Sequence, residues 1–165
     1  MAASASEDRA LGGHGKFMDQ LLKLAREALA EGEAPLAALV RKEARVLTRA
    51  RATPAASGLR QHPELMALDS AGEAARDGSL YVTVEPCAMC LGAAALLRVK
   101  EVIYAVADPQ EGGFHTVIYT GDLAARAPAG IGGICREQVT ELIREYLQRQ
   151  PRGPESARLR ALLAS

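Results

Sequence analysis

The chain has 165 residues, a hydrophobic fraction of 48% and no formal net charge, which is typical of one globular domain and excludes a disordered or strongly basic protein. Its polar, acidic start lacks the pattern of a secretory signal, and its apolar runs are too short to span a membrane. We therefore expect a soluble cytoplasmic protein with no membrane partner. In that reducing compartment, three cysteines do not predict a disulfide framework.

Helices and strands are predicted to alternate along the chain. In chain order, hydrophobic periodicity and turn residues predict a helix at 16–30, strands at 35–40 and 46–50, a helix at 63–76, a strand at 79–84, a helix at 86–97, a strand at 100–107 and a helix at 136–149. The helices between the strands predict an α/β fold, a three-layer α/β/α sandwich around one mixed sheet.

The other segments have weaker patterns. Residues 108–133 contain several glycines, and FHTVIY within them is compatible with a short strand or a short helix. Residues 155–163 have the pattern of a short helix. We therefore expect a flexible N-terminal tail at 1–15, one domain at 16–150 and a C-terminal tail at 151–165.

The stretch EPCAMC places two of the three cysteines, Cys87 and Cys90, at the start of a predicted helix. With a spacing of three residues they share one helix face, and the unpaired N–H groups of the first turn favour thiolate over thiol. A redox pair and half of a metal site would both use this arrangement, so a partner elsewhere in the chain must decide between them. Cys135 has no such partner nearby, and we interpret it as a buried structural thiol.

A candidate partner is His62-Pro63-Glu64, also at a predicted helix start. A catalytic zinc ion takes three protein ligands and keeps a fourth position open, and His62 completes such a set with the two cysteines. The carboxylate of Glu64 would lie beside the open position, where it can take a proton from water and deliver it to a leaving nitrogen. Each half is weak alone, but H-x-E followed by P-C-x-x-C is the signature of zinc-dependent base deaminases.

The segments HPELMAL and LYVTVEPCAMCLGAAALLRVKEVIYAV resemble the cytidine deaminase superfamily, most closely its tRNA-adenosine deaminase (TadA-like) branch. EGEAPLAALV and REQVTELIREYLQRQ extend the resemblance to roughly residues 16–150. It implies a five-stranded sheet between helices, one Zn²⁺ per chain on His62, Cys87 and Cys90, Glu64 as the catalytic proton shuttle, and a homodimer. Periodicity by itself predicts four of those strands.

The activity that the resemblance implies is hydrolytic: an exocyclic amino group of a purine or pyrimidine base, free or in a nucleoside, is replaced by a carbonyl and ammonia is released. Two alternatives stay open. One is adenosine-to-inosine editing of tRNA. The other is a non-catalytic, deaminase-like subunit with a structural zinc ion, although such a subunit would have no use for Glu64.

The substrate contacts are harder to assign. Family members usually carry an asparagine after the second strand that holds the base, and this chain has no asparagine at all. We consider Thr48, Arg51 or a backbone group as its replacement, together with Pro86 beside the first cysteine. Phe114 and His115 lie where family members place residues that close over the base, although such single residues are more often packing or surface residues. The proline within H-x-E replaces the usual alanine, which a first helical turn tolerates.

Charge bears on the tRNA alternative. A tRNA-binding protein needs clustered Lys and Arg for phosphates, and a net charge of zero does not support one. Locally, Arg45, Arg49 and Arg51 fall on one face of the second predicted strand. They would form either a phosphate-binding rim beside the pocket or a solvated edge strand protected by charge, and we favour the second interpretation.

Overall fold

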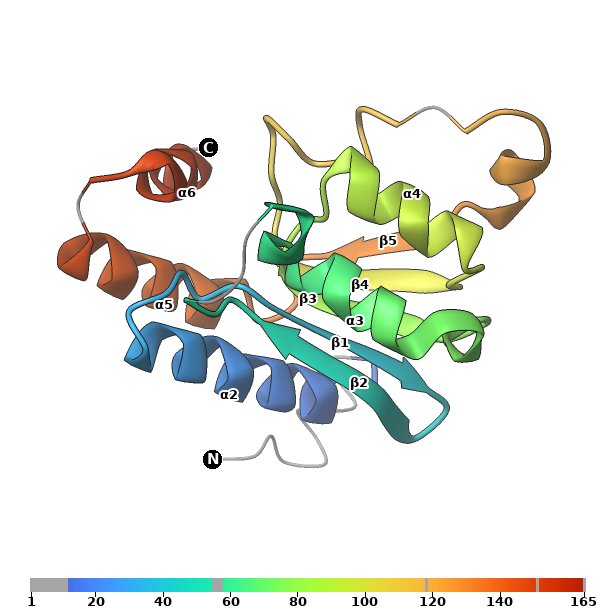
Figure 1. The fold of residues 1–165 in the computed structure, drawn as a ribbon, viewed down its shortest axis with the longest axis horizontal. Helices are drawn as coiled ribbons and strands as arrows, with labels where there is room; N and C mark the ends of the chain where they lie inside the picture. Colours follow the sequence, from blue (N-terminus) through green and yellow to red (C-terminus); the bar gives the residue numbers. More distant parts are fainter. Residues whose placement is uncertain (1–11, 55–57, 118, 151, 165) are drawn as a thin grey trace.

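Five strands form one mixed sheet in the order β2-β1-β3-β4-β5, and helices cover both of its faces (Figure 1). The structure is a computed structural model, and it describes residues 12–54, 58–117, 119–150 and 152–164. The strands are β1 (Ala37–Lys42), β2 (Arg45–Arg51), β3 (Ser79–Val84), β4 (Glu101–Val106) and β5 (Ala129–Gly132). β1 runs antiparallel to β2 and β3, whereas β4 runs parallel to β3 and β5. The predicted mixed α/β/α sandwich is confirmed.

The helices divide into two layers because the strand residues alternate between the faces of the sheet. α2 (Gly15–Ala30) and α5 (Arg136–Arg149) cover one face, and α3 (Pro63–Ala71) and α4 (Ala88–Leu96) cover the other (Figure 1). Along β3, Tyr81 packs with α2 and α5, whereas Leu80 and Val82 pack with α3 and α4. The two apolar cores are therefore mostly aliphatic, and they hold the sheet between the layers.

The fifth strand is the element that local pattern did not predict. Its sequence AGIG has little strand propensity, but a Cβ on Gly132 would lie 2.6 Å from the ring of Tyr104 on the neighbouring strand, and one on Gly130 would lie 2.8 Å from Phe114. Side chains from adjacent segments thus occupy the space above both glycines. The described residues of FHTVIY form neither a strand nor a helix, and the nearest helical element is the 3₁₀ turn η3 (Gly121–Arg126).

Two helix boundaries differ by two residues or more from the sequence prediction. α3 ends at Ala71 because Gly72 adopts a φ of 52°, and a separate 3₁₀ turn, η2 (Gly72–Ala75), replaces its predicted last turn. α4 begins at Ala88 rather than Pro86. The backbone before it stays extended, since the N–H of Gly113 donates to the carbonyl of Pro86 at 2.8 Å. Cys87 is consequently the N-cap of α4, one position outside the helix.

The C-terminal residues form a helix that belongs to the core. α6 (Pro154–Leu163) lies beside α5 (Figure 1), and its residues Leu159 and Leu162 are buried in the same apolar cluster as α2 and α5. Most of the predicted N-terminal tail, residues 1–11, lies outside the described residues. Within the described residues, no helix has the length and apolar character that crossing a membrane requires.

Candidate metal centre and active site

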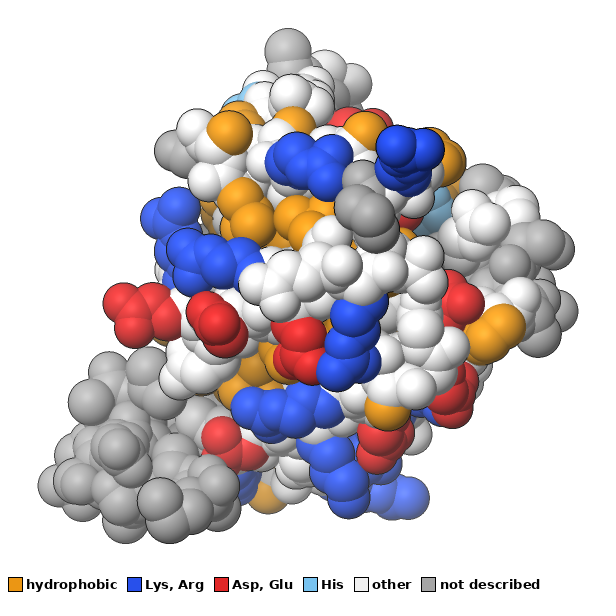
Figure 2. Space-filling model, turned by 90° about the vertical axis from the view of Figure 1, so that its left-hand side faces the viewer, with side chains coloured by type: hydrophobic (Ala, Val, Ile, Leu, Met, Phe, Trp, Pro, Cys, Tyr) orange, Lys and Arg blue, Asp and Glu red, His pale blue; other side chains and the backbone are white. Residues whose placement is uncertain are grey.

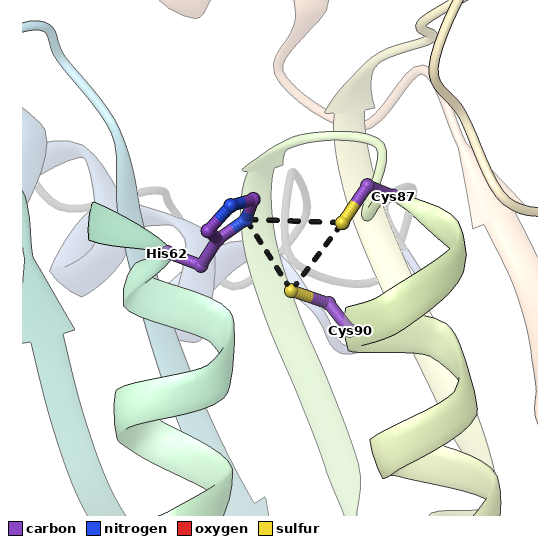
Figure 3. Close-up of side chains that lie close together, drawn as sticks. All are labelled: His62, Cys87 and Cys90. Atoms are coloured by element: carbon purple, nitrogen blue, oxygen red, sulfur yellow. Dashed lines mark hydrogen bonds between the residues drawn. The ribbon is translucent and has the colours of Figure 1, made fainter. Parts of the chain in front are cut away.

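Two helix starts bring three ligand-type side chains together. His62 is the N-cap of α3, with Pro63 at the first helical position, where its missing N–H leaves no intrahelical bond unmade. Cys87 is the N-cap of α4, and Cys90 lies in the first turn of that helix. Figure 3 shows the three side chains pointing toward one another from the ends of these neighbouring helices. The structure thus assembles residues that are separated by up to 28 positions in sequence.

The spacing of the three ligand atoms fits a tetrahedral metal ion. Nδ1 of His62 lies 3.7 Å from Sγ of Cys87 and 3.6 Å from Sγ of Cys90, and the two sulfurs are 3.7 Å apart. Bonds of about 2.3 Å to sulfur and about 2.0–2.1 Å to nitrogen would separate tetrahedral ligands by about 3.5–3.8 Å. The sulfurs are too far apart for a disulfide, whose S–S bond is about 2.05 Å. The group could therefore hold a metal ion.

The electrostatics of the two thiols also suit metal binding. A hydrogen bond between them lowers the pKa of Cys87 to about 5 and, together with burial, raises the pKa of Cys90. One of the sulfurs is thus readily available as the thiolate that metals bind. Cys135 lies apart from this group, as the N-cap of α5, and burial raises its pKa. It was interpreted as a buried structural thiol, and in the structure it is half-buried and packs against the core cluster.

Glu64 follows Pro63 in the first turn of α3 and is 7% exposed. Burial raises the pKa of Glu64 to about 7. A hydrogen bond from its own backbone N–H lowers the pKa, but this effect is smaller than that of burial. A carboxyl group with a pKa near neutrality can both accept and release a proton at physiological pH, which is the requirement for a general acid–base group.

Two adjoining cavities open from this group. The inner cavity, about 60 Å³, is bordered by Glu64, His62 and Cys87, and it has room for a few water molecules. The outer cavity, about 560 Å³, falls within the size range of small-molecule sites and includes Thr53 and Pro54 in its lining. Residues that border both cavities mark where they meet: Leu36, Gln61, His62, Glu155 and Arg158.

Two of those shared residues lie on α6 and were not predicted as site residues. Arg158 forms ion pairs with Asp108 at 3.2 Å, with Glu111 at 3.1 Å and with Glu155 at 3.5 Å. Burial raises the pKa of Glu155, against the opposing effect of Arg158. The sequence signal for α6 was its amphipathic pattern, but local pattern did not indicate which part of the protein the helix would cover.

Glu85 was also missed. Its buried carboxylate accepts the N–H of Asp108 at 2.9 Å through Oε2 and the N–H of Phe114 at 3.1 Å through Oε1, which fixes the segment after β4. A usable signal existed, because Glu85 and Asp108 each follow one of two parallel strands. The carboxyl ends of neighbouring parallel strands lie at the same edge of a sheet, where α/β proteins bind ligands.

The predicted substrate contacts on β2 lie outside both cavities. The hydroxyl of Thr48 donates to the carbonyl of Ala67 at 2.8 Å and ties β2 to α3. Arg51 donates two hydrogen bonds, at 2.6 and 2.8 Å, to the carboxylate of Glu31, the C-cap residue of α2, and thereby lowers the pKa of Glu31. Since β2 is the edge strand of the sheet, the favoured interpretation of its arginines as a charged edge agrees with their positions.

The other predicted contacts are likewise absent from the linings of both cavities. Phe114 stacks on Tyr104 with ring centroids 5.7 Å apart and packs against the core under α4. His115 is exposed, with Nδ1 3.8 Å from Oε1 of Glu85. Pro86 is buried in the extended segment before α4. Ala52 and Thr53, just after β2, line the outer cavity in the region where an asparagine was expected.

The chain resembles known proteins over most of its length. A family model described as MafB19-like deaminase matches residues 13–128. A tRNA-specific adenosine deaminase 2 of Xenopus tropicalis is 30% identical over 157 residues, covering 85% of this chain and 92% of that protein. A solved structure from a study of A-to-I editing by tRNA:A34 deaminases at the wobble position of transfer RNA has a TM-score of 0.65 and 27% identity, covering 76% of this chain and 97% of that one.

A second type of relative is much longer. A tRNA(Ile)-lysidine synthase of Deinococcus deserti is 36% identical over 142 residues, and a homologous synthase of Thermus thermophilus is 37% identical over 142 residues. The match covers 79% of this chain in the first case and 84% in the second, but 26% of each synthase. The chain therefore spans about a quarter of the length of these relatives.

Proposed function

The chain belongs to the MafB19-like deaminase family, within the cytidine deaminase superfamily and its TadA-like branch, and from this premise we propose that it is a zinc-dependent hydrolase acting on an amino-substituted base. It would replace an exocyclic amino group of a purine or pyrimidine, as free base or nucleoside, by a carbonyl and release ammonia. The observation that carries this proposal is the convergence of His62, Cys87 and Cys90. Two of these residues, His62 and Cys87, border one small cavity together with the buried Glu64.

The ligand set favours zinc. One imidazole nitrogen and two sulfurs are the donors of a known class of three-ligand catalytic zinc sites, in which one tetrahedral position stays open. His62, Cys87 and Cys90 would hold the ion. When bound, zinc supplies Lewis acidity and lets water act as a nucleophile at neutral pH.

Glu64 is the proposed proton shuttle. Its carboxylate accepts a proton from the attacking water and passes it to a ring nitrogen of the substrate, which makes the adjacent carbon electrophilic. The hydroxyl group now on that carbon gives its proton by way of Glu64 to the amino group, which leaves as ammonia, and the carbon–oxygen bond becomes a carbonyl. The burial of Glu64 supports this role, because it keeps the pKa of the carboxyl near 7.

The test combines metal content with turnover. We expect the Glu64→Gln variant to retain one zinc ion per chain. Its rate of turnover should fall by about 10²–10⁴-fold, which is the typical contribution of general acid–base catalysis. His62→Ala should lose both the metal and the turnover. Ammonia release would be measured over adenosine, guanine, cytosine, cytidine, aminotriazines and a tRNA anticodon stem-loop, with zinc content measured by elemental analysis.

The matched control is Glu73→Gln, which neutralises an exposed glutamate in η2, outside both cavities. It should behave like the unmodified protein in both measurements. Unchanged turnover in Glu64→Gln would refute the role of that residue, and unchanged zinc content in His62→Ala would refute the ligand set. Zinc binding without ammonia from any compound would favour the non-catalytic subunit.

The relatives named as tRNA-specific adenosine deaminases favour a second candidate function, the editing of adenosine in tRNA. In that case turnover would be confined to the stem-loop. Its apparent affinity would fall steeply as salt concentration rises, because phosphate contacts release counterions.

We further propose a cytoplasmic homodimer. The resemblance to the TadA-like branch supports the dimer. So do Met89 and Leu96, seven residues apart on α4, which are the exposed large hydrophobic side chains among the described residues. A reducing compartment would keep the three cysteines as the free thiols that the site requires.

A further inference from the structure

α6 supplies part of the wall of the candidate active site. Glu155 and Arg158 border both the inner cavity beside Glu64 and the outer cavity, so they flank the passage between the two. Pro154, the first residue of α6, also lines the outer cavity. A molecule that moves from the outer cavity toward Glu64 therefore meets the side chains of α6 on its way.

α6 is held firmly in that position. Leu159 is fully buried, Leu162 is 2% exposed, and the hydroxyl of Ser156 donates to the carbonyl of Gln150 at 2.7 Å. Arg158 adds a link to the segment after β4, through Asp108 and Glu111. Apolar packing of its leucines and ion pairs of Arg158 thus hold α6 in place as a wall of the cavity.

The linings of the two cavities are acidic. Their described side chains include five glutamates, namely Glu33, Glu64, Glu85, Glu111 and Glu155. Among the same described side chains, Arg158 is the single Lys or Arg, and the carboxylates of Asp108, Glu111 and Glu155 already pair with it. This single guanidinium therefore lies among three carboxylates, and the group that they form together has no net positive charge to offer a phosphate.

The surface around this end of the molecule does not gather basic side chains that would offset the acidic lining of the cavities. Figure 2 shows the side on which α6 and the adjoining ends of α2 and α5 lie; its basic side chains are spread over the whole face, with acidic ones between them mainly in its middle and lower part. Phosphate-binding surfaces instead gather Lys and Arg on one face. The remaining lining of the outer cavity combines apolar walls, such as Leu36 and Pro54, with neutral polar groups on Thr53 and Gln61, a composition that suits an uncharged heterocycle.

We propose that the acidic cavity closed by α6 restricts the substrate to an uncharged free base or nucleoside and rejects substrates that carry phosphate, including nucleotides and RNA. This inference rests on the proposed hydrolase function and deepens it by naming the substrate class. Each phosphate brought into the cavity would meet more carboxylates than the single guanidinium of Arg158 can balance, and like charges repel one another. The proposal therefore opposes the tRNA-editing alternative.

The test compares matched substrates that differ by a phosphate. With the full zinc-loaded chain, kcat/KM would be measured for adenosine and adenosine 5′-monophosphate, for cytidine and cytidine 5′-monophosphate, and for the anticodon stem-loop. We expect the nucleoside of the active pair to exceed its monophosphate by at least about tenfold. The double variant Glu33→Gln/Glu111→Gln should narrow that ratio by at least about threefold, as should raising the salt to about 0.5 M, which shortens the Debye length toward 4 Å.

The control double variant is Glu73→Gln/Glu137→Gln, which removes two exposed acids that do not line either cavity. It should leave the ratio unchanged. A monophosphate or stem-loop that is turned over as fast as the nucleoside would overturn the proposal. The proposal would also be overturned if the Glu33→Gln/Glu111→Gln variant had the same ratio of nucleoside to monophosphate kcat/KM as the unmodified protein.

A calorimetric titration with adenosine and its monophosphate separates this inference from the proposed function. If no compound releases ammonia, the proposed hydrolase fails, but tighter binding of adenosine than of its monophosphate would still support the selectivity of the cavity. Binding of the monophosphate at least as tight as that of adenosine, or binding of neither, would overturn it.

Discussion

At the scale of single residues, Glu85 organises the edge of the sheet at which the site lies. It directly follows β3, is 4% exposed, and receives backbone N–H groups from Asp108 and Phe114. Gly112 leaves space for this carboxylate, because a Cβ there would lie 2.4 Å from Cδ of Glu85. Glu85 thereby positions the segment whose Asp108 pairs with Arg158, and it connects β3 with α6 through two contacts.

This arrangement predicts that Glu85→Gln destabilises the protein. A glutamine side chain presents one acceptor group and one donor group, so at least one of the two backbone N–H groups would face an NH₂ group and lose its partner. We expect a loss of about 1–3 kcal/mol in the free energy of unfolding, or a decrease in Tm of about 2–12 °C for a chain of this length. Thermal unfolding would measure it, with Glu73→Gln as the exposed control. Equal stability of Glu85→Gln and the unmodified protein would contradict this account.

At the scale of elements, α6 contributes to both the core and the candidate site. A C-terminal tail with a short helix at 155–163 was expected, and α6 buries Leu159 and Leu162 against α5 and the rest of that core cluster. The chain leaves α5 at Gln150, whose carbonyl accepts the hydroxyl of Ser156 on α6. Stability and site construction are therefore coupled, because the helix that completes the apolar core also carries Arg158 into the cavity wall.

The prediction for α6 concerns Leu159. Leu159→Ala removes a fully buried side chain, and we expect a loss of about 2–5 kcal/mol in the free energy of unfolding, from lost burial and the cavity that remains. Chemical denaturation would give the value. Ala157→Ser, an exposed change on the same helix, should alter it by less than about 0.5 kcal/mol. If Leu159→Ala had no more effect than the control, α6 would not be part of the folded core.

At the scale of the whole molecule, one side of the sandwich exposes apolar side chains. Leu96 on α4 is 65% exposed and Met89 is 37% exposed, whereas α2 and α5 cover the opposite face of the sheet. Isolated exposed hydrophobic residues are common, but these two lie two turns apart on one helix, in a chain proposed to pair with a second copy.

We therefore expect Leu96→Glu to weaken the proposed homodimer. A charge placed in an apolar interface loses water without gaining a partner, so the variant should elute as a monomer at concentrations where the unmodified chain is a dimer. Light scattering coupled to size-exclusion chromatography would measure the two masses. Asp69→Glu, an exposed conservative change on α3, is the control. A monomeric unmodified chain would refute the dimer, and a dimeric Leu96→Glu variant would place its interface elsewhere.

Local sequence patterns predicted much of the fold and the chemistry of the proposed site. The periodicity of 136–149 matches α5 in both bounds, and SLYVTV is β3, because regular burial leaves a regular pattern. H-x-E and P-C-x-x-C could be recognised because each half of the group lies within a few residues at a helix start. The start of α4 near Pro86 and the end of α3 near Gly72 were less predictable, because a contact with Gly113 and the backbone conformation of Gly72 set these boundaries.

The sequence by itself thus determined the layered α/β architecture and which residues carry the proposed chemistry, since both depend on residue type and short spacing. The tertiary structure alone decided what surrounds that chemistry. It paired AGIG with β4 because neighbouring rings fill the space above its glycines, and it directed Thr48 and Arg51 to α3 and α2 rather than to the cavities. It also placed Glu155 and Arg158, some ninety residues after His62, beside Glu64, because contacts between distant segments follow from packing and leave no local pattern.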